Sequence, residues 1–313
     1  MDTILYLLAR ALVSGVQQLP LAWAARLGRA AGAAAFVLDV RHRRIARDNL
    51  RLAFGATRSP QQLAQLNREH FRRLGENYAC AIRTAAMSAD QIRHHLSFLG
   101  TDQFLTDRDE RGPRSCVIAI GHFGNFELYA RYPQFEPAFR GATTYRGLRQ
   151  PGLNRLLKSL RERTGCMYFD RRTDAAALRA AFTERGFMLG LLADQHAGRH
   201  GIRLPFLGHE CSTSPAPAIF ARRYNARLFT AYCFRNRLAH WSFEVGREIP
   251  LRDEGRLRSV VELTQDVNRD FERAVLRDPA NWFWVHNRWK PARTRPRPTP
   301  APTHHAPTAS SAG

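Results

Sequence analysis

Hydrophobic residues in the middle of the chain form short continuous runs that alternate with amphipathic stretches. The runs at 115–120 and 187–193 are long enough for buried strands. The same pattern predicts further strands at 143–145, 166–169, 228–234 and 240–245, and helices at 126–132, 152–163, 174–185 and 257–276. Thr173 is the expected N-cap of the helix at 174–185. This alternation predicts an α/β fold with a mostly parallel central sheet covered by helices.

The first 40 residues have a different pattern. One helical stripe carries leucine and valine, and its opposite face carries arginine, serine and glutamine, which predicts an amphipathic helix over 4–19. Polar residues interrupt every run of 18 residues, so we do not expect a membrane-spanning helix. A cleaved signal peptide is also not expected, because no positive charge precedes Arg10. We interpret 1–40 as a segment that lies on a membrane surface. The alternative is an ordinary core helix followed by a solvated basic helix.

The remaining sequence divides into two parts. Residues 41–290 are long enough for a single α/β domain. Residues 40–95 are read as a helical lead-in to it without a chemical motif. Residues 291–313 are rich in proline, alanine, threonine and serine, which predicts a disordered tail.

The charge is strongly positive. The chain carries 48 Lys and Arg against 27 Asp and Glu, a net charge of +21, and only Lys158 and Lys290 are lysines. Such an excess indicates a polyanionic partner, for which an anionic lipid headgroup or an acidic carrier protein is a candidate. Nucleic acid is disfavoured, because the sequence has no zinc-ligand spacing, Walker loop, G-x-G-x-x-G or aromatic RNA-binding motif. An anionic membrane surface accounts for the charge more simply.

A candidate acid/base pair follows the strand at 115–120. His122 and Glu127 are five residues apart, and Gly121 and Gly124 permit a tight turn between strand and helix. Because this spacing does not place both side chains on one helix face, the turn must bring Glu127 beneath the imidazole. The pair would then act as a general base on a hydroxyl. The alternative is a histidine that only satisfies a local carboxylate.

Cysteine and serine chemistry is not expected. The five cysteines are scattered without C-x-x-C spacing, which indicates free thiols, and Cys116 lies inside an apolar run. The sequence has no G-x-S-x-G elbow. We therefore expect no covalent intermediate on a cysteine or serine of the protein, and neither a cofactor nor a metal.

Five segments resemble, in order, those of the lipid A late acyltransferases, the lauroyl/myristoyl transferase branch of the lysophospholipid acyltransferase superfamily. They are GHFGNFE at 121–127, YRGLRQPGLNRLLKSLRERTG at 145–165, GLLADQ at 190–195, LPFLG at 204–208 and WFWVHNRWK at 282–290. The resemblance implies that His122 and Glu127 are the H-x-x-x-x-E catalytic pair, and that Arg161 and Asp194 are the arginine and aspartate of the later motifs. Glutamate rather than aspartate in the pair is typical of the lipid A branch.

The resemblance also implies a reaction. An acyl chain would pass from an acyl carrier protein thioester to a hydroxyl of a 3-hydroxyacyl chain on an anionic glycolipid, a lipid A precursor, in lipopolysaccharide biosynthesis. The work would take place at the cytoplasmic face of the bacterial inner membrane. Two alternatives stay open: a related acyltransferase acting on another glycolipid, an amino-acid lipid or a lysophospholipid, and a non-catalytic basic protein that binds membranes.

Roles for further residues are hypotheses at this point. Arg161 would stabilise charge on the carbonyl oxygen or hold a phosphate, with Arg146 and Arg163 as weaker candidates. Asp194 would orient Arg161 or other site groups, or would only form an N-cap or salt bridge. Tryptophans 282, 284 and 289 are expected in the core or at the bilayer interface. Other expected substrate-binding residues are Asn125 and Gln195, with His286 and Arg288 as a pair that either binds a headgroup or supports the site from behind.

Overall fold

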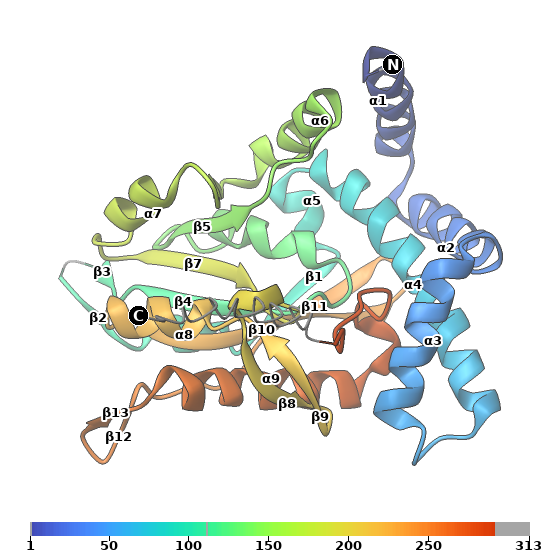
Figure 1. Cartoon of the computed structure of the whole chain (residues 1–313). Coiled ribbons are helices and arrows are strands. Elements are labelled where there is room, and N and C mark those ends of the chain that lie inside the picture. Colours follow the sequence, from blue (N-terminus) through green and yellow to red (C-terminus); the bar gives the residue numbers. More distant parts are fainter. Residues whose placement is uncertain (1, 111, 292–313) are drawn as a thin grey trace, which may run out of the picture.

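The computed structural model describes residues 2–110 and 112–291, so the predicted tail lies almost entirely outside the described residues. A seven-stranded sheet forms the centre (Figure 1). Its strands, in spatial order, are β1 (Leu96–Leu99), β11 (His240–Val245), β10 (Arg227–Arg237), β4 (Cys116–Ile120), β7 (Phe187–Leu192), β5 (Arg140–Tyr145) and β6 (Met167–Asp170). Every neighbouring pair is parallel except β10 and β11. The predicted fold class is confirmed.

In the part of the chain that the structure describes, three two-stranded ribbons accompany the sheet. They are β2 (Arg108–Asp109) with β3 (Gly112–Pro113), β8 (Ile202–Phe206) with β9 (His209–Thr213), and β12 (Arg252–Asp253) with β13 (Arg256–Leu257). The helices are α1 (Asp2–Gln18), α2 (Leu21–Leu38), α3 (Val40–Phe54), α4 (Pro60–Ala85), α5 (Ala89–Arg93), α6 (Pro151–Arg161), α7 (Ala175–Ala181), α8 (Ala216–Arg223) and α9 (Val260–Arg277). Short 3₁₀ helices are η1 (Thr101–Leu105), η2 (Phe126–Gln134), η3 (Glu162–Thr164), η4 (Gly198–His200) and η5 (Pro279–Asn281).

Two apolar cores cover the two faces of the sheet. Alternate residues of a strand point to opposite faces. On β4, Val117 and Ala119 therefore pack in one core with side chains of α7, α8 and α9. Ile118 and Ile120 pack in the other core with side chains of α5, η1 and η2. Because both faces are covered, the strand is apolar along its whole length, as its sequence predicted.

Helix α2 packs on α4 through close contacts between their backbones. A Cβ atom on Gly28 would lie 2.5 Å from the carbonyl oxygen of Gly75, and one on Gly32 would lie 2.1 Å from that of Phe71. Larger residues at these positions would force the helices apart. By length and composition alone, α2 is long and apolar enough to cross a membrane, which our sequence analysis did not expect. Its glycine face is nonetheless occupied by α4.

Helix α1 has no buried residue, and it contacts α4 and α6 (Figure 1). The side chains of Leu8 and Leu12 are 66% and 67% exposed. The predicted N-terminal helix therefore exists, with its apolar stripe largely uncovered.

Several boundaries differ from the sequence prediction. Helix α7 ends at Ala181 and not at 185, and its N-cap is Asp174, so the assignment of Thr173 is wrong. Helix α9 starts at Val260 because the preceding residues form the β12–β13 ribbon, and Ser259 caps it with Glu262 in a capping box. Strand β1 and the β8–β9 ribbon were not predicted. These elements are short: β1 is stabilised by its pairing with the distant β11, and β8 and β9 pair with each other as a local hairpin.

Candidate active site

The residues after β4 form a tightly held turn. Gly124 has φ of 52°, a conformation that favours glycine, and a Cβ atom there would lie 2.3 Å from the carbonyl oxygen of Cys233. The amide of Gly124 donates to the carbonyl of Asn281 at 3.1 Å. Phe123 forms an isolated antiparallel bridge with Trp282. Contacts from two distant segments thus fix the backbone that carries His122.

Asp194 is the carboxylate that holds His122. The Nδ1 atom of His122 lies 2.6 Å from Oδ1 of Asp194, and the amide of His122 donates to Oδ2 at 2.7 Å. Strand register explains the pairing. Ile120 of β4 is paired with Leu192 of β7, and each functional residue lies two positions past its member of that pair. Parallel neighbours end at the same edge of the sheet, where open α/β sheets bind ligands.

Trp282 completes the environment of Asp194. Its indole Nε1 donates to Oδ2 of Asp194 at 2.7 Å. Burial works against ionisation of Asp194, but the charge and hydrogen bonds of His122, with the bond from Trp282, outweigh burial and lower the pKa of Asp194. An ionised Asp194 accepts the proton of Nδ1, so Nε2 of His122 is left free to take a proton. Trp282 had been assigned only to the core or the bilayer interface.

Glu127 does not hold His122, and this part of our sequence prediction is wrong. Its carboxylate binds Arg161 instead, with Nη2 at 2.7 Å from Oε1 and Nε at 3.3 Å from Oε2. Burial opposes the charge of Arg161, but Glu127 outweighs it and raises the pKa of the guanidinium. The turn places the ring of Phe126 beside the imidazole, with centroids 4.8 Å apart, and the next side chain is directed to α6.

His122, Glu127 and Arg161 line one cavity of about 210 Å³. Its polar groups also include two buried amides, Asn125 and Asn281. The opposite walls come from α4 and α6 and are mostly apolar: Leu74, Tyr78, Ala81, Ile82, Ala85, Leu157 and Leu160. The cavity therefore combines a histidine base with room for a hydrocarbon chain.

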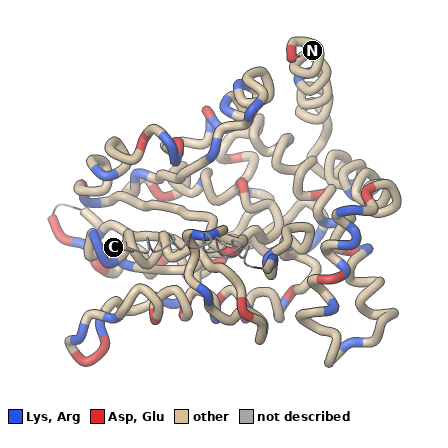
Figure 2. Tube along the Cα trace, viewed as in Figure 1, with Lys and Arg blue, Asp and Glu red and all other residues tan. Residues whose placement is uncertain are grey.

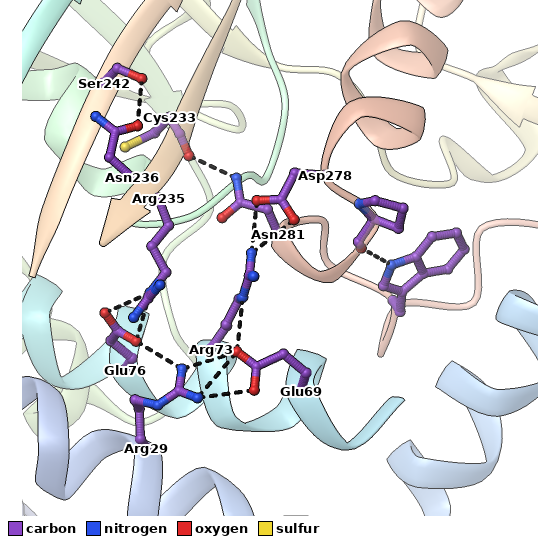
Figure 3. Close-up of polar contacts among 12 residues, drawn as sticks. Arg29, Glu69, Arg73, Glu76, Cys233, Arg235, Asn236, Ser242, Asp278 and Asn281 are labelled. Atoms are coloured by element: carbon purple, nitrogen blue, oxygen red, sulfur yellow. Dashed lines mark hydrogen bonds and ion pairs between the residues drawn. The ribbon is translucent and has the colours of Figure 1, made fainter. Parts of the chain in front are cut away.

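The segment that follows α9 is fastened to α4 and β10 (Figure 3). The Nη1 atom of Arg73 lies 2.7 Å from Oδ2 of Asp278. The side-chain amide of Asn281 donates to the carbonyl of Cys233 at 3.0 Å. These bonds fix the position of Asn281, which accepts from the turn at Gly124, and of Trp282, which donates to Asp194.

A buried ion-pair cluster joins α4 to its neighbours on both sides (Figure 3). Glu76 is fully buried on α4; it accepts from Arg235 of β10 at 2.9 Å and from Arg29 of α2 at 3.2 Å. Removing one partner of such a cluster leaves an uncompensated buried charge. The N-terminal helices and the sheet thereby fix α4, the main apolar wall of the cavity.

The other predicted substrate-binding residues fall into three groups. Asn125 is buried and lines the cavity, and its Nδ2 lies 3.5 Å from the hydroxyl of Thr84. Arg146 and Arg163 are exposed and do not line it, so their roles stay predictions.

His286, Gln195 and Arg288 form the third group. Arg288 is fully buried and donates to the carbonyls of Ser212 and Gln195, at 2.5 and 3.3 Å. It fixes the loop after β7 and is not accessible to a headgroup, so of its two expected roles the headgroup contact is wrong and the supporting role remains. Burial lowers the pKa of His286 to about 4, and its Nε2 accepts from the amide of His196 at 2.9 Å.

A histidine held by a buried aspartate beside an apolar cavity is an arrangement suited to a general base, and it marks this cavity as the candidate active site. The family model of the bacterial lipid A biosynthesis acyltransferases matches residues 2–291. The chain belongs to this family, and it is an acyltransferase of lipid A biosynthesis. Proteins of the family are associated with bacterial membranes. No curated protein matches the sequence.

Proposed function

We propose that the protein transfers a fatty acyl chain from an acyl carrier protein thioester to the hydroxyl of a 3-hydroxyacyl chain on a lipid A precursor. The observation that carries this proposal is the His122–Asp194 pair at the wall of an apolar cavity, in a chain of this family. Nε2 of His122 takes the proton of the acceptor hydroxyl. The oxygen attacks the thioester carbonyl, and the imidazolium then returns the proton to the departing thiolate.

Transfer is direct in this proposal. A cysteine nucleophile would need a thiolate, but burial raises the pKa of Cys116, in the strand before His122, far above its usual range. Burial likewise raises the pKa of Cys166 to about 12.

Arg161, fixed by Glu127, would stabilise the negative charge on the carbonyl oxygen. The apolar walls from α4 and α6 would hold the acyl chain and exclude water.

We place the protein on the cytoplasmic face of the inner membrane. Large apolar side chains are exposed on α1 and α2, among them Leu12, Trp23 and Leu38, the last being 80% exposed. Helix α3 follows with exposed arginines at 41, 44, 47 and 51. Figure 2 shows basic positions recurring along this helix. An apolar surface beside a basic helix favours the boundary of an anionic leaflet. Flotation with anionic and neutral vesicles tests the proposed membrane binding. Charged substitutions at Leu8 and Leu12 should reduce the fraction of protein that floats with the vesicles.

The reaction is tested with the full chain in membranes. Wild type, His122→Ala and the exposed-histidine control His94→Ala are incubated with a tetra-acylated lipid A precursor and a panel of acyl carrier protein and coenzyme A thioesters. Mass spectrometry should detect one added acyl chain with wild type and His94→Ala, and a loss of about 10²-fold or more with His122→Ala. Addition only from coenzyme A thioesters would overturn the proposed donor. No addition from any donor by folded, membrane-bound protein would overturn the proposed acceptor.

A further inference from the structure

A second hollow adjoins the catalytic cavity on the far side of Arg161. It measures about 270 Å³, and we call it the outer lobe; it is lined by Tyr145, Leu157, Lys158, Arg161, Glu162, Cys166 and Tyr168. Leu157 and Arg161 line the catalytic cavity as well. Tyr145 and Tyr168 lie on neighbouring parallel strands, β5 and β6, near their carboxyl ends. The two hollows therefore share part of one wall, and His122 lines the catalytic cavity.

The lobe contains two cationic groups with free donors. Lys158 is exposed, and its Nζ lies 6.0 Å from the ring centroid of Tyr145. Its charge helps to lower the pKa of Asp174, but among the described residues no ion pair within 4 Å joins the two. Arg161 uses Nε and Nη2 on Glu127, which leaves Nη1 without a bond among the described residues. Lys158 is one of only two lysines among 48 basic residues. Its ammonium is a compact point charge with three donors.

The remaining groups of the lobe are compatible with an anion. Burial keeps Cys166 protonated, since its pKa is raised to about 12, and it also raises the pKa of Tyr168. The hydroxyl of Tyr168 lies 3.3 Å from that of Thr164 and stays neutral. Glu162 is the one carboxylate in the lining, and it is exposed, so water screens its charge.

We propose that the outer lobe binds a phosphate ester of a substrate, with Lys158 as its principal ligand. This inference rests on the proposed function, because both substrates of that reaction carry phosphate: the glycolipid on its sugars and the carrier protein in its phosphopantetheine arm. Arg161 lines the same lobe, so its charge also favours a phosphate beside Lys158. The bound substrate then passes over Arg161, with its headgroup or arm in the lobe and its reacting end beside His122.

The first measurement is binding, which does not require turnover. Full-length wild type, Lys158→Ala, Lys158→Arg and the matched control Lys290→Ala are titrated in detergent with a phosphorylated tetra-acylated glucosamine disaccharide and with its dephosphorylated form. Losing a charge-assisted phosphate contact should weaken binding of the phosphorylated lipid about tenfold in Lys158→Ala. Lys158→Arg should restore most of it, and Lys290→Ala should bind like wild type. All four proteins should bind the dephosphorylated lipid alike.

A second arm measures steady-state kinetics and separates the two sources of phosphate. A KM raised for the glycolipid alone assigns the lobe to the acceptor. Unchanged glycolipid binding together with a KM raised about tenfold for the carrier thioester assigns it to the phosphopantetheine diester. Unchanged KM values for both substrates in Lys158→Ala, with acyl transfer intact, would overturn the proposal that the outer lobe binds phosphate. If wild type transfers no acyl chain, the proposed function fails, and the binding titration alone decides the lobe: the phosphate-dependent difference supports it and its absence refutes it.

Discussion

The imidazole of His122 and the carboxylate of Asp194 are joined by a 2.6 Å contact across 72 positions of sequence. The strands that carry them are parallel neighbours, so the pair is a direct consequence of sheet order. Asp194 also accepts the amide of His122, which fixes ring and backbone together. Because Nδ1 is occupied by Asp194, Nε2 is the ring nitrogen that remains to take a proton.

Asp194→Asn should therefore inactivate the enzyme without unfolding it. An amide can donate to Nδ1 and so stabilise the wrong tautomer, and the loss in kcat should be about 10³ to 10⁴-fold, as in other histidine–aspartate pairs. The measurement is acyl transfer by purified variant protein whose thermal unfolding matches wild type. Activity within tenfold of wild type would show that Asp194 is not the orienting group.

Trp282→Phe tests the third member of the arrangement. The substitution removes the bond to Asp194 and keeps an aromatic ring in the core. Without that donor less offsets the burial of Asp194, so the pKa of Asp194 rises and the acid limb of the kcat/KM profile should move upward. We expect a loss of about tenfold at neutral pH, in line with one charge-assisted hydrogen bond.

Trp289→Phe is the matched control for Trp282. Its indole donates to the carbonyl of Phe206 at 3.2 Å, and its ring lies 6.1 Å from that of Trp282. It should lose packing to a similar degree and leave the acid limb in place. Equal shifts in both variants would mean that the effect is one of packing alone.

The Glu127–Arg161 pair should behave as one unit. Glu127→Gln frees a largely buried guanidinium, and Arg161→Gln leaves the carboxylate unpaired. We expect each change to lower kcat at least about tenfold, and the double variant to lose no more than the worse single variant, because removing both members of a unit costs little beyond removing one. The measurement is a double-mutant cycle of acyl-transfer rates for wild type, the two single variants and the double variant. Additive losses would assign independent roles to the two residues.

Sequence patterns predicted the strands around the site better than the contacts within it. The apolar runs before His122 and Asp194 were recognised as strands because both faces of the central sheet are buried. The partner of His122 was assigned to Glu127 because local spacing carries no information on which strands are neighbours. Once β4 and β7 are adjacent, Asp194 is the natural partner.

Other errors have the same origin in tertiary packing. Arg288 looked like a headgroup ligand, but burial against three oxygen acceptors makes it structural. The indole of Trp282 points to Asp194 only because the segment after α9 folds back on the catalytic turn. Gly28 and Gly75 gave no signal in the hydrophobic pattern, since their role is a contact between two helices.

His70 should make the fold sensitive to acid. It lies fully buried on α4, and burial lowers its pKa from 6.5 to about 4. Between pH 6.5 and pH 4 the unfolded chain binds a proton on His70 that the folded protein does not. The contribution of neutral His70 to the free energy of unfolding is therefore fully present above pH 6.5 and is lost as the pH falls toward 4. The total is on the order of 3 kcal/mol. Unfolding by denaturant at pH 7 and pH 5 should show a smaller loss in His70→Gln than in wild type, whereas the exposed control His94→Gln should behave like wild type. Equal losses in all three would remove His70 as the cause.

The walls from α4 and α6 should set the length of the acyl chain. Ala81 lines the cavity among larger apolar side chains, so a phenylalanine there would fill volume without adding charge. Each methylene that no longer fits costs about 1 to 3 kcal/mol in kcat/KM, and Ala81→Phe should therefore shift the preferred donor to shorter chains while its best rate stays within about tenfold of wild type. The measurement is competition among carrier thioesters of graded length, with product masses as the readout. Ala180→Phe, an exposed alanine of α7, is the control and should keep the wild-type preference. An unchanged preference in Ala81→Phe would place the acyl chain outside this cavity and would leave the cavity to another part of a substrate.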